Sequence, residues 1–456
     1  MRRWDVFMGS CVIGFLALAS CREPEPFPES QYDKRLSGGS NTVFDNTAKA
    51  FGNPFPDLGS SDLFVHELGD KQFEAIFVTP PALVNPGLGP LYNNVSCVSC
   101  HHNDGIGVPT AGEAQSSLLL RISLPGIDEH GGPLPVPGYG TQVQDKAVFG
   151  RRAEAQVAIS YSYQEYTFAD GEPYELRAPT YTLAGLSTPI DGTFLLSPRL
   201  APPVFGLGLL EAVPEYEILA HVLSGDSGAV HGKANYVWDP VSRSVMLGRF
   251  GWKANVATIL TQVAMAYNQD IGITTSIFPQ EGTTAPPNSD SVLPPPELSD
   301  RLLQATRFYV QTLAVPARRN AGNLQVLHGE ALFQSAKCSS CHLPTLTTGV
   351  SIAFPALSNQ RIHPYTDLLL HDMGEGLADG RPDYLASGSE WRTAPLWGIG
   401  LVEVVNYPAY YLHDGRARTL VEAIMWHGGE AEPSKEFFGQ LSKADRDAII
   451  AFLKSL

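Results

Sequence analysis

Four of the six cysteines lie in two copies of one short motif. Cys97-Val-Ser-Cys100-His101 and Cys338-Ser-Ser-Cys341-His342 share the spacing C-x-x-C-H. The two thiols of this motif can add to the vinyl groups of a haem, and the histidine that follows can ligate the iron. Half of a zinc site, a redox dithiol and a disulfide are the alternatives for a single copy. Because no cysteine is left over outside the N-terminal leader, the two copies predict two covalent haems c, with His101 and His342 as proximal ligands.

The chain is long enough to enclose both cofactors. Its 456 residues suffice for two or three domains, and its 43% hydrophobic and 17% charged residues are typical of a globular protein. The 43 glycines and 36 prolines indicate long irregular segments. The formal charge of -16 argues against nucleic acid as a partner. A small oxidant such as hydrogen peroxide, or a basic redox protein that supplies electrons, would suit this charge better.

The N-terminus has the pattern of an export signal. Arg2 and Arg3 precede an apolar run, residues 12–19, that is too short to span a bilayer as a mature helix. Leu18-Ala-Ser-Cys21 resembles a bacterial lipobox, so we expect residues 1–20 to be a lipoprotein signal peptide and Cys21 to be lipidated. Cleavage near Ala19, giving a soluble periplasmic protein, is the alternative. We expect the protein at the periplasmic face of the bacterial outer membrane. The lipid would be its only anchor to that membrane.

Proline-rich and glycine-rich segments divide the rest of the chain. Residues 21–45 predict a flexible tether, and the prolines of residues 283–298 predict an extended linker. An N-terminal haem c domain is therefore expected at residues 46–282 and a C-terminal cytochrome c-like domain at residues 299–456. Ser299 can cap a helix just after the linker. Ser442 with Asp445 can cap a last helix whose apolar face carries Ile449, Ile450, Phe452, Leu453 and Leu456.

The two halves are similar beyond the cysteine motif. The segment from Arg199 to Glu211 matches the segment from Arg392 to Glu403 with one inserted residue. The first copy also carries a long insertion between its cysteines and its arginine. Parts of this insertion, residues 155–163 and 174–177, alternate in polarity and predict local β-structure.

Several segments resemble one known family. They are Pro364-Tyr-Thr-Asp-Leu-Leu-Leu-His-Asp-Met-Gly, Trp391-Arg-Thr-Ala-Pro-Leu-Trp-Gly, Leu412-His-Asp-Gly-Arg-Ala, Gly206-Leu-Gly-Leu-Leu-Glu-Ala-Val-Pro and Gly248-Arg-Phe-Gly-Trp-Lys-Ala. With these segments, most of the mature chain resembles the bacterial di-haem oxidoreductases that are called peroxidases or thiol oxidoreductases. That family is similar to the di-haem cytochrome c peroxidases and to the methylamine dehydrogenase maturation enzyme.

The resemblance implies a mainly α fold. It consists of two cytochrome c-like haem domains, the first enlarged by an irregular, partly β insertion. The chain departs from the family pattern at Ile106, where an arginine is usual, and at residues 224–232, which lack an aspartate-rich loop. We therefore do not expect calcium in that loop.

Reduction of peroxide takes two electrons, so a substrate-binding haem paired with an electron-transfer haem is a sensible arrangement, and the two irons should differ in their sixth ligand. Thr419 and Glu422 form a capping-box pattern that predicts a helix with His427 close to its apolar face. His427 is therefore the predicted sixth ligand of the second iron, as the position after the D-G-R-A segment in the related peroxidases also implies. A hydrogen-bonded core histidine is the alternative, and Met425, His371 and Met373 are the other candidate ligands.

The first haem has no equally clear sixth ligand. Glu211 is a candidate acid/base for proton transfer between the oxygens of peroxide, with a structural pairing to Arg199 or the capping of a turn as the alternatives. Arg199 and Arg392 are candidates to hold haem propionates. Trp252 is a candidate electron relay between the haems, with simple core packing as the alternative.

These residues favour a peroxidase-like di-haem oxidoreductase. An electron-transfer cytochrome without catalysis is one alternative, and it requires strong sixth ligands at both irons. A di-haem enzyme that oxidises side chains of a partner protein is another. A thiol substrate has no support in the sequence, because no cysteine outside the two motifs remains in the mature domains.

Overall fold

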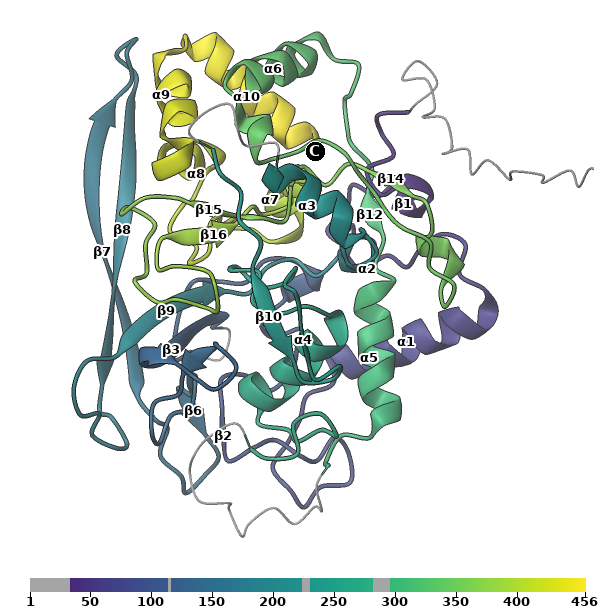
Figure 1. Cartoon of the computed structure of the whole chain (residues 1–456), viewed down its shortest axis with the longest axis vertical. Helices are drawn as coiled ribbons and strands as arrows, with labels where there is room; N and C mark the ends of the chain where they lie inside the picture. The colour runs from purple at the N-terminus through teal and green to yellow at the C-terminus, as the bar shows by residue number, and fades with distance from the viewer. Residues whose placement is uncertain (1–32, 114–115, 224–229, 282–295) are drawn as a thin grey trace, which may run out of the picture. The chain divides into compact units, whose positions relative to one another are not determined.

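The computed structural model describes residues 33–113, 116–223, 230–281 and 296–456 (Figure 1). The predicted signal peptide, Cys21, most of the tether and nearly all of the predicted linker lie outside these ranges, as does most of the loop at residues 224–232. The chain divides into two compact units, residues 1–34 and 35–456. Everything below concerns the second unit.

One pair of long helices lies beside the first cysteine motif. Helix α1 (Ser60–Glu74) packs against α5 (Asp300–Gln311), and α4 (Ile259–Ala266) packs on α5 as well (Figure 1). The approach of α1 to α5 is close, because a Cβ at Gly69 would lie 2.1 Å from the carbonyl oxygen of Ala305. Helix α5 follows Ser299, as predicted, although Ser299 makes no side-chain capping bond. It comes from the predicted C-terminal domain but packs on helices from the N-terminal half, and the domain boundary stays a prediction.

A second pair of helices lies beside the second motif. Helix α6 (Leu324–Ser335) packs against α10 (Lys443–Ser455), and a Cβ at Gly329 would lie 1.9 Å from the carbonyl oxygen of Ala448. The Ser442 hydroxyl caps α10 by accepting a hydrogen bond from the backbone N–H of Asp445, as its sequence predicted. The buried face of α10 contains Ile449, Phe452 and Leu453, also as predicted.

Five further α-helices are present in the described ranges. They are α2 (Leu207–Glu211), α3 (Glu215–Leu223), α7 (Val402–Val405), α8 (Leu420–Met425) and α9 (Glu432–Gln440).

The long insertion of the first half folds as β-structure. Strand β3 (Leu118–Ile127) pairs antiparallel with β4 (Pro133–Leu134), β5 (Gln142–Val143) and β9 (Leu195–Leu200). Strands β7 (Gln156–Thr167) and β8 (Pro173–Ala184) form a separate two-stranded ribbon, with Gln156 opposite Ala184 (Figure 1). The strands expected in this insertion are therefore present, and they extend well beyond the residues that predicted them.

The other strands occur in short pairs. They are β1 (Thr42–Val43) with β12 (Val315–Pro316), β2 (Leu91–Tyr92) with β6 (Lys146–Ala147), β10 (Tyr236–Asp239) with β11 (Ser244–Leu247), β13 (Leu346–Thr347) with β14 (Arg361–Ile362), and β15 (Leu370–Asp372) with β16 (Glu390–Arg392). The β1–β12 pair is parallel and the others are antiparallel.

The expectation of a mainly α fold is wrong. The structure is 29% helix and 21% strand, with many small sheets, and two cytochrome c-like domains are not shown. The physical reason is the abundance of glycine and proline, which end helices, together with side-chain bonds that support irregular backbone in their place. For example, the Asn406 side chain donates to the carbonyl oxygen of His102, and the Asn103 side chain donates to that of Val405. Within the described ranges, no helix is both long and apolar enough to cross a membrane.

Candidate functional site

The first cysteine motif folds as a tight turn on the wall of a cavity. The backbone N–H groups of Cys100 and His101 both donate to the carbonyl oxygen of Cys97, which brings the two thiols to the same side of the turn. Cys97, Cys100 and His101 all line a cavity of about 250 Å³, and no disulfide joins the cysteines. We call this space the first cavity.

The second motif has the same arrangement. A 3-10 turn covers Cys338–Ser340, and the backbone N–H of His342 donates to the carbonyl oxygen of Cys338 over 3.0 Å. Cys338, Cys341 and His342 line a second cavity of about 260 Å³, again with no disulfide. Its walls are mainly apolar, with residues contributed by α6, α8 and α10.

The two motif histidines make the same kind of hydrogen bond, which leaves one ring nitrogen of each available to a metal. His101 Nδ1 lies 2.7 Å from the carbonyl oxygen of Pro202, and His342 Nδ1 lies 3.0 Å from that of Tyr365. A carbonyl oxygen can only accept, so each Nδ1 carries the proton and each Nε2 keeps its lone pair. Burial lowers the pKa of both imidazoles to about 4, so both are neutral at pH 7. These neutral, oriented imidazoles beside paired thiols fit a haem in each cavity.

His427 lies on the wall of the second cavity together with His342. Helix α8 begins after Thr419, whose hydroxyl accepts a hydrogen bond from the backbone N–H of Glu422. The Glu422 carboxylate accepts from the backbone and side chain of Arg418 and not from Thr419, so only half of the predicted capping box is formed. Just beyond the end of α8, His427 Nδ1 lies 2.7 Å from the carbonyl oxygen of Ala423, and burial lowers the pKa of the imidazole. His427 therefore has the same tautomer as the two motif histidines, with Nε2 available to a metal.

The alternative ligands of the second cavity are placed less favourably. His371 lies between Asp367 and Glu430, and each of its ring nitrogens is 2.8 Å from a carboxylate oxygen. Burial opposes its charged form, but the hydrogen bonds to Asp367, Cys341 and Glu430 outweigh this effect and raise the pKa of His371 to about 12. An imidazolium with both nitrogens occupied cannot bind iron.

Three other side chains could serve as ligands in the second cavity only if they line it. Met425 does not line the second cavity, whereas Met373 does. His413, which was not among the ligands predicted from the sequence, lies on the same wall and stacks on Trp391 with the ring centroids 3.7 Å apart.

The first cavity offers a different set of side chains. In the part of the chain that the structure describes, His101 is the one histidine on its wall, and no methionine lies there. Its polar groups include the amides of Asn255 and Gln262, the guanidinium of Arg121 and the carboxylate of Asp270. Burial raises the pKa of Asp270, and the charge of Arg121 opposes this rise. Apart from His101 and the two motif cysteines, the described wall thus provides hydrogen-bonding groups and no further imidazole, thiol or thioether ligand for iron.

Glu211 does not lie on the wall of the first cavity. It ends α2, and its carboxylate accepts from the backbone N–H of Ile259 at 2.8 Å and from the side-chain amide of Gln311 at 3.0 Å. These bonds connect α2 to α4 and α5, which is a structural role. The acid/base role stays a prediction, and this placement lends it no support. The alternative pairing with Arg199 is not made, because Arg199 bonds to Asp383 at 2.7 Å.

The two cavities share one wall. This wall includes Trp252, Trp397 and Arg392, each of which lines the first and the second cavity. The Trp252 indole N–H donates to the carbonyl oxygen of Leu200 at 2.7 Å, and its backbone carbonyl accepts from the backbone N–H of Arg392 at 2.8 Å. Trp252 is therefore held between the two sites, where a relay would have to lie. Sequence reasoning missed Trp397, although it belongs to the repeated segment that begins at Arg392.

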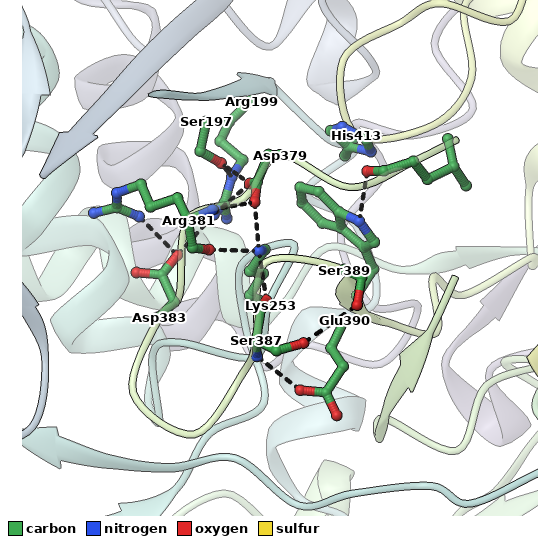
Figure 2. Close-up of polar contacts among 12 residues, drawn as sticks. Ser197, Arg199, Lys253, Asp379, Arg381, Asp383, Ser387, Ser389, Glu390 and His413 are labelled. Atoms are coloured by element: carbon green, nitrogen blue, oxygen red, sulfur yellow. Dashed lines mark hydrogen bonds and ion pairs between the residues drawn. The ribbon is translucent and has the colours of Figure 1, made fainter. Parts of the chain in front are cut away.

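A buried polar network surrounds Lys253, the residue that follows Trp252 (Figure 2). Lys253 is fully buried, and its ammonium donates to the Asp379 carboxylate and to the carbonyl oxygens of Arg381 and Ser387, all within 2.8 Å. The ammonium also lies 4.5 Å from the centre of the Trp391 ring, a cation–π distance. The network fixes the segment that follows Trp252 against the loop before β16, and so holds the shared wall in place.

Two cavities with identical motifs and oriented histidines define a protein with two cofactor sites suited to haem. The chain belongs to the family described as "Di-haem oxidoreductase, putative peroxidase", which matches residues 32–456. The resemblance found in the sequence is thereby confirmed, and with it the general class of haem-using oxidoreductase. No curated protein and no solved structure matches the chain.

A separate metal site would need its own cluster of ligands. Across the described ranges, no group of three or more His, Cys, Asp and Glu side chains could hold a metal ion. Most of the loop at residues 224–232, where calcium was not expected, is outside those ranges.

Proposed function

We propose that this protein is a peroxidase-like enzyme with two covalently attached haems c and a division of labour between them. Cys97 and Cys100 would hold the first haem, with His101 as its proximal ligand. Cys338 and Cys341 would hold the second, with His342 proximal and His427 as the sixth ligand. The first site would bind the substrate, and the second would transfer electrons.

The observation that supports this division is the difference in imidazoles between the cavities. The second cavity has His342 and His427 on its wall, both with Nδ1 bonded to a backbone carbonyl. The first has His101 alone within the described residues. A metal with two strong axial ligands is closed to substrate, whereas a metal with one keeps a position open.

The substrate that we propose is hydrogen peroxide, which takes up two electrons and two protons to give two waters. When bound, the haems supply one-electron redox chemistry and an iron position for the peroxide. The chain contributes the surroundings of that position. The Asn255 and Gln262 amides lie on the wall of the first cavity and can donate hydrogen bonds to a bound oxygen.

A proton donor is also needed at the first cavity. Asp270 is the one carboxylate among the described residues on its wall, and its raised pKa favours the protonated form that can donate. We propose Asp270 as a candidate beside Glu211, whose carboxylate lies off the wall.

Electrons would reach the first site through the shared wall. Trp252 borders both cavities, so we propose it as the relay, with Trp397 as a second aromatic residue in the same position. The donor would be a redox protein with a basic docking surface, which complements the formal charge of -16.

We also propose that the protein is exported and held by a lipid on Cys21 at the periplasmic face of the outer membrane. This rests on the lipobox-like Leu18-Ala-Ser-Cys21. A Cys21→Ser variant should move from the membrane fraction to the soluble periplasm. An unchanged membrane fraction would contradict lipidation.

Electron paramagnetic resonance of the oxidised protein tests the division of labour. The proposal predicts one high-spin ferric signal from the first haem and one low-spin signal from the second. Two low-spin signals in the oxidised protein, with the one remaining ferric signal still low-spin after half-reduction, would instead indicate an electron-transfer cytochrome without catalysis.

A further inference from the structure

Arg392 is a half-buried cation with no carboxylate partner among the described residues. Its Nε donates to the carbonyl oxygen of Gly251 at 2.9 Å, and one Nη donates to that of Thr393 at 3.2 Å. Within the described part of the chain, no carboxylate lies within 4.0 Å of this guanidinium. Burial lowers the pKa of Arg392 to about 10, partly offset by the charge of Asp367, so the group is still protonated at pH 7.

This arrangement is costly unless an anion completes it. A guanidinium has five N–H donors, and the two hydrogen bonds of the Arg392 side chain use two of them, both with neutral carbonyl groups. A buried charge is normally paired, because carbonyl groups alone do not replace the hydration that it loses. The unused donors are therefore suited to a carboxylate, which guanidinium binds in a bidentate manner.

The position of Arg392 shows where such a carboxylate must come from. Among the described residues that line both cavities, Arg392 is the one cation. Arg199 also lines the first cavity, but its guanidinium is already paired with Asp383 and Asp379. Arg121 lines the first cavity alone, where its side chain donates to that of Gln269.

We propose that Arg392 is a shared carboxylate-binding residue that takes a haem propionate from each of the two cofactor sites. The inference rests on the proposed binding of haem in both cavities. The reduced iron carries one less positive charge than the oxidised iron, so a nearby cation favours the reduced form. The single charge of Arg392 would therefore raise the reduction potentials of both haems together. Arg392 is then a positioning residue and not a catalytic one.

The test is a spectroelectrochemical titration of the full-length holoprotein and its variants. Arg392→Gln should lower both midpoint potentials, and Arg392→Lys, which keeps the charge, should lower them less. Arg121→Gln should lower the midpoint potential of the first haem alone. Arg319→Gln is the matched control, because Arg319 also donates to backbone carbonyls and also has its pKa lowered to about 10 by burial, but it lines neither cavity. It should change neither potential.

A shift of one potential alone in Arg392→Gln would overturn the sharing, and unchanged potentials would overturn the proposal altogether. If Arg392→Gln does not fold or does not load haem, resonance Raman spectroscopy of Arg392→Lys replaces it. Loss of the guanidinium hydrogen bonds should then shift the propionate bending bands of both haems, and unshifted bands would overturn the proposal. Spin states recorded on the same samples test the division of labour separately, since two low-spin haems would contradict that division and leave the result for Arg392 intact.

Discussion

The two cavities are alike around the cysteine motif and different in the other side chains on their walls. In both, a turn presents two thiols, a backbone carbonyl orients the motif histidine, and a glycine lets two helices approach closely, Gly69 against Ala305 and Gly329 against Ala448. The second cavity then adds His427, and the described wall of the first has no counterpart. An internal repeat can thus preserve the cysteine motif and still surround its two copies with different side chains, and under the proposed function these other side chains decide what each iron could bind.

The repeat also explains why this difference was hard to foresee. His221 follows Glu211 by the same spacing as His413 follows Glu403. His413 lies on the wall of the second cavity, but His221, in α3, does not line the first. Equal spacing along the chain therefore does not give equal placement in the two halves.

The largest expected effect comes from removing one attachment motif. The double variant Cys338→Ser/Cys341→Ser should hold one covalent haem in place of two, because each pair of thiols serves one cavity. The matched variant Cys97→Ser/Cys100→Ser should also hold one, and the two single-haem proteins should differ in spin state. The haem content per chain, measured as the pyridine haemochrome, checks the count. Two covalent haems in either variant would contradict the assignment.

The next effect tests the common part of the two sites. Gly69→Ala and Gly329→Ala should each destabilise the protein by roughly 1–3 kcal/mol or more, because the new Cβ would lie within 2.1 Å of a carbonyl oxygen and force the helices apart. Gly439→Ala in α9 is the control, since no atom lies within 4 Å of the position that its Cβ would take. It should stabilise by about 0.5–1 kcal/mol, as alanine does in a helix. Denaturant unfolding measures all three, and equal midpoints would argue against the close approach.

Glu211→Gln separates a structural carboxylate from a catalytic one. The loss of charge on the bond to Ile259 N should cost about 1 kcal/mol of stability, and the placement predicts an unchanged rate of reaction with peroxide. Asp270→Asn should instead slow that reaction, because its carboxyl lies on the wall of the first cavity. Stopped-flow spectroscopy measures both rates. A slow Glu211→Gln beside a normal Asp270→Asn would restore the acid/base role predicted for Glu211 from the sequence.

A smaller effect concerns buried charge near the first cavity. Burial raises the pKa of Glu154 to about 8, and the hydrogen bond from Gln144 N offsets this only in part. The folded pKa lies above the ordinary value of 4.5, so the contribution of Glu154 to stability is complete below pH 4.5 and is lost as pH rises through 8. Glu154→Gln should remove this decline. Unfolding free energies measured from pH 4.5 to 9 should fall less steeply for the variant, and parallel curves would contradict the assignment.

The sequence predicted the parts of the site that depend on local chemistry. The motifs at residues 97–101 and 338–342 each line a cavity, and His427, chosen from the helical periodicity before it, lines the second cavity, while its role as a ligand stays a prediction. Trp252 was also chosen from the sequence as a residue between the two sites, and it lines both cavities. The roles of Arg392 and Trp397 depend on which distant segments meet at the shared wall, and no periodicity records this.

The fold class was predicted less well, for a related reason. The helices beside each motif have clear apolar faces and caps, so α5 and α10 were expected at their observed positions. The remaining backbone is held by long-range bonds, such as those of Asn406 to His102 and of Lys253 to Arg381 and Ser387. Such bonds leave no local pattern, and the resemblance to helical haem proteins therefore gave too much helix.

The central claim is that His427 is the sixth ligand of the second iron, whereas the sixth position of the first iron is open to substrate. Electron paramagnetic resonance of oxidised His427→Ala tests it most directly, because removing one imidazole should convert the low-spin ferric signal to a high-spin signal, and added imidazole should partly reverse the change. The account predicts two high-spin haems in this variant. A low-spin signal that survives the substitution would contradict the account and move the search for the ligand to Met373 and His413, which line the same cavity.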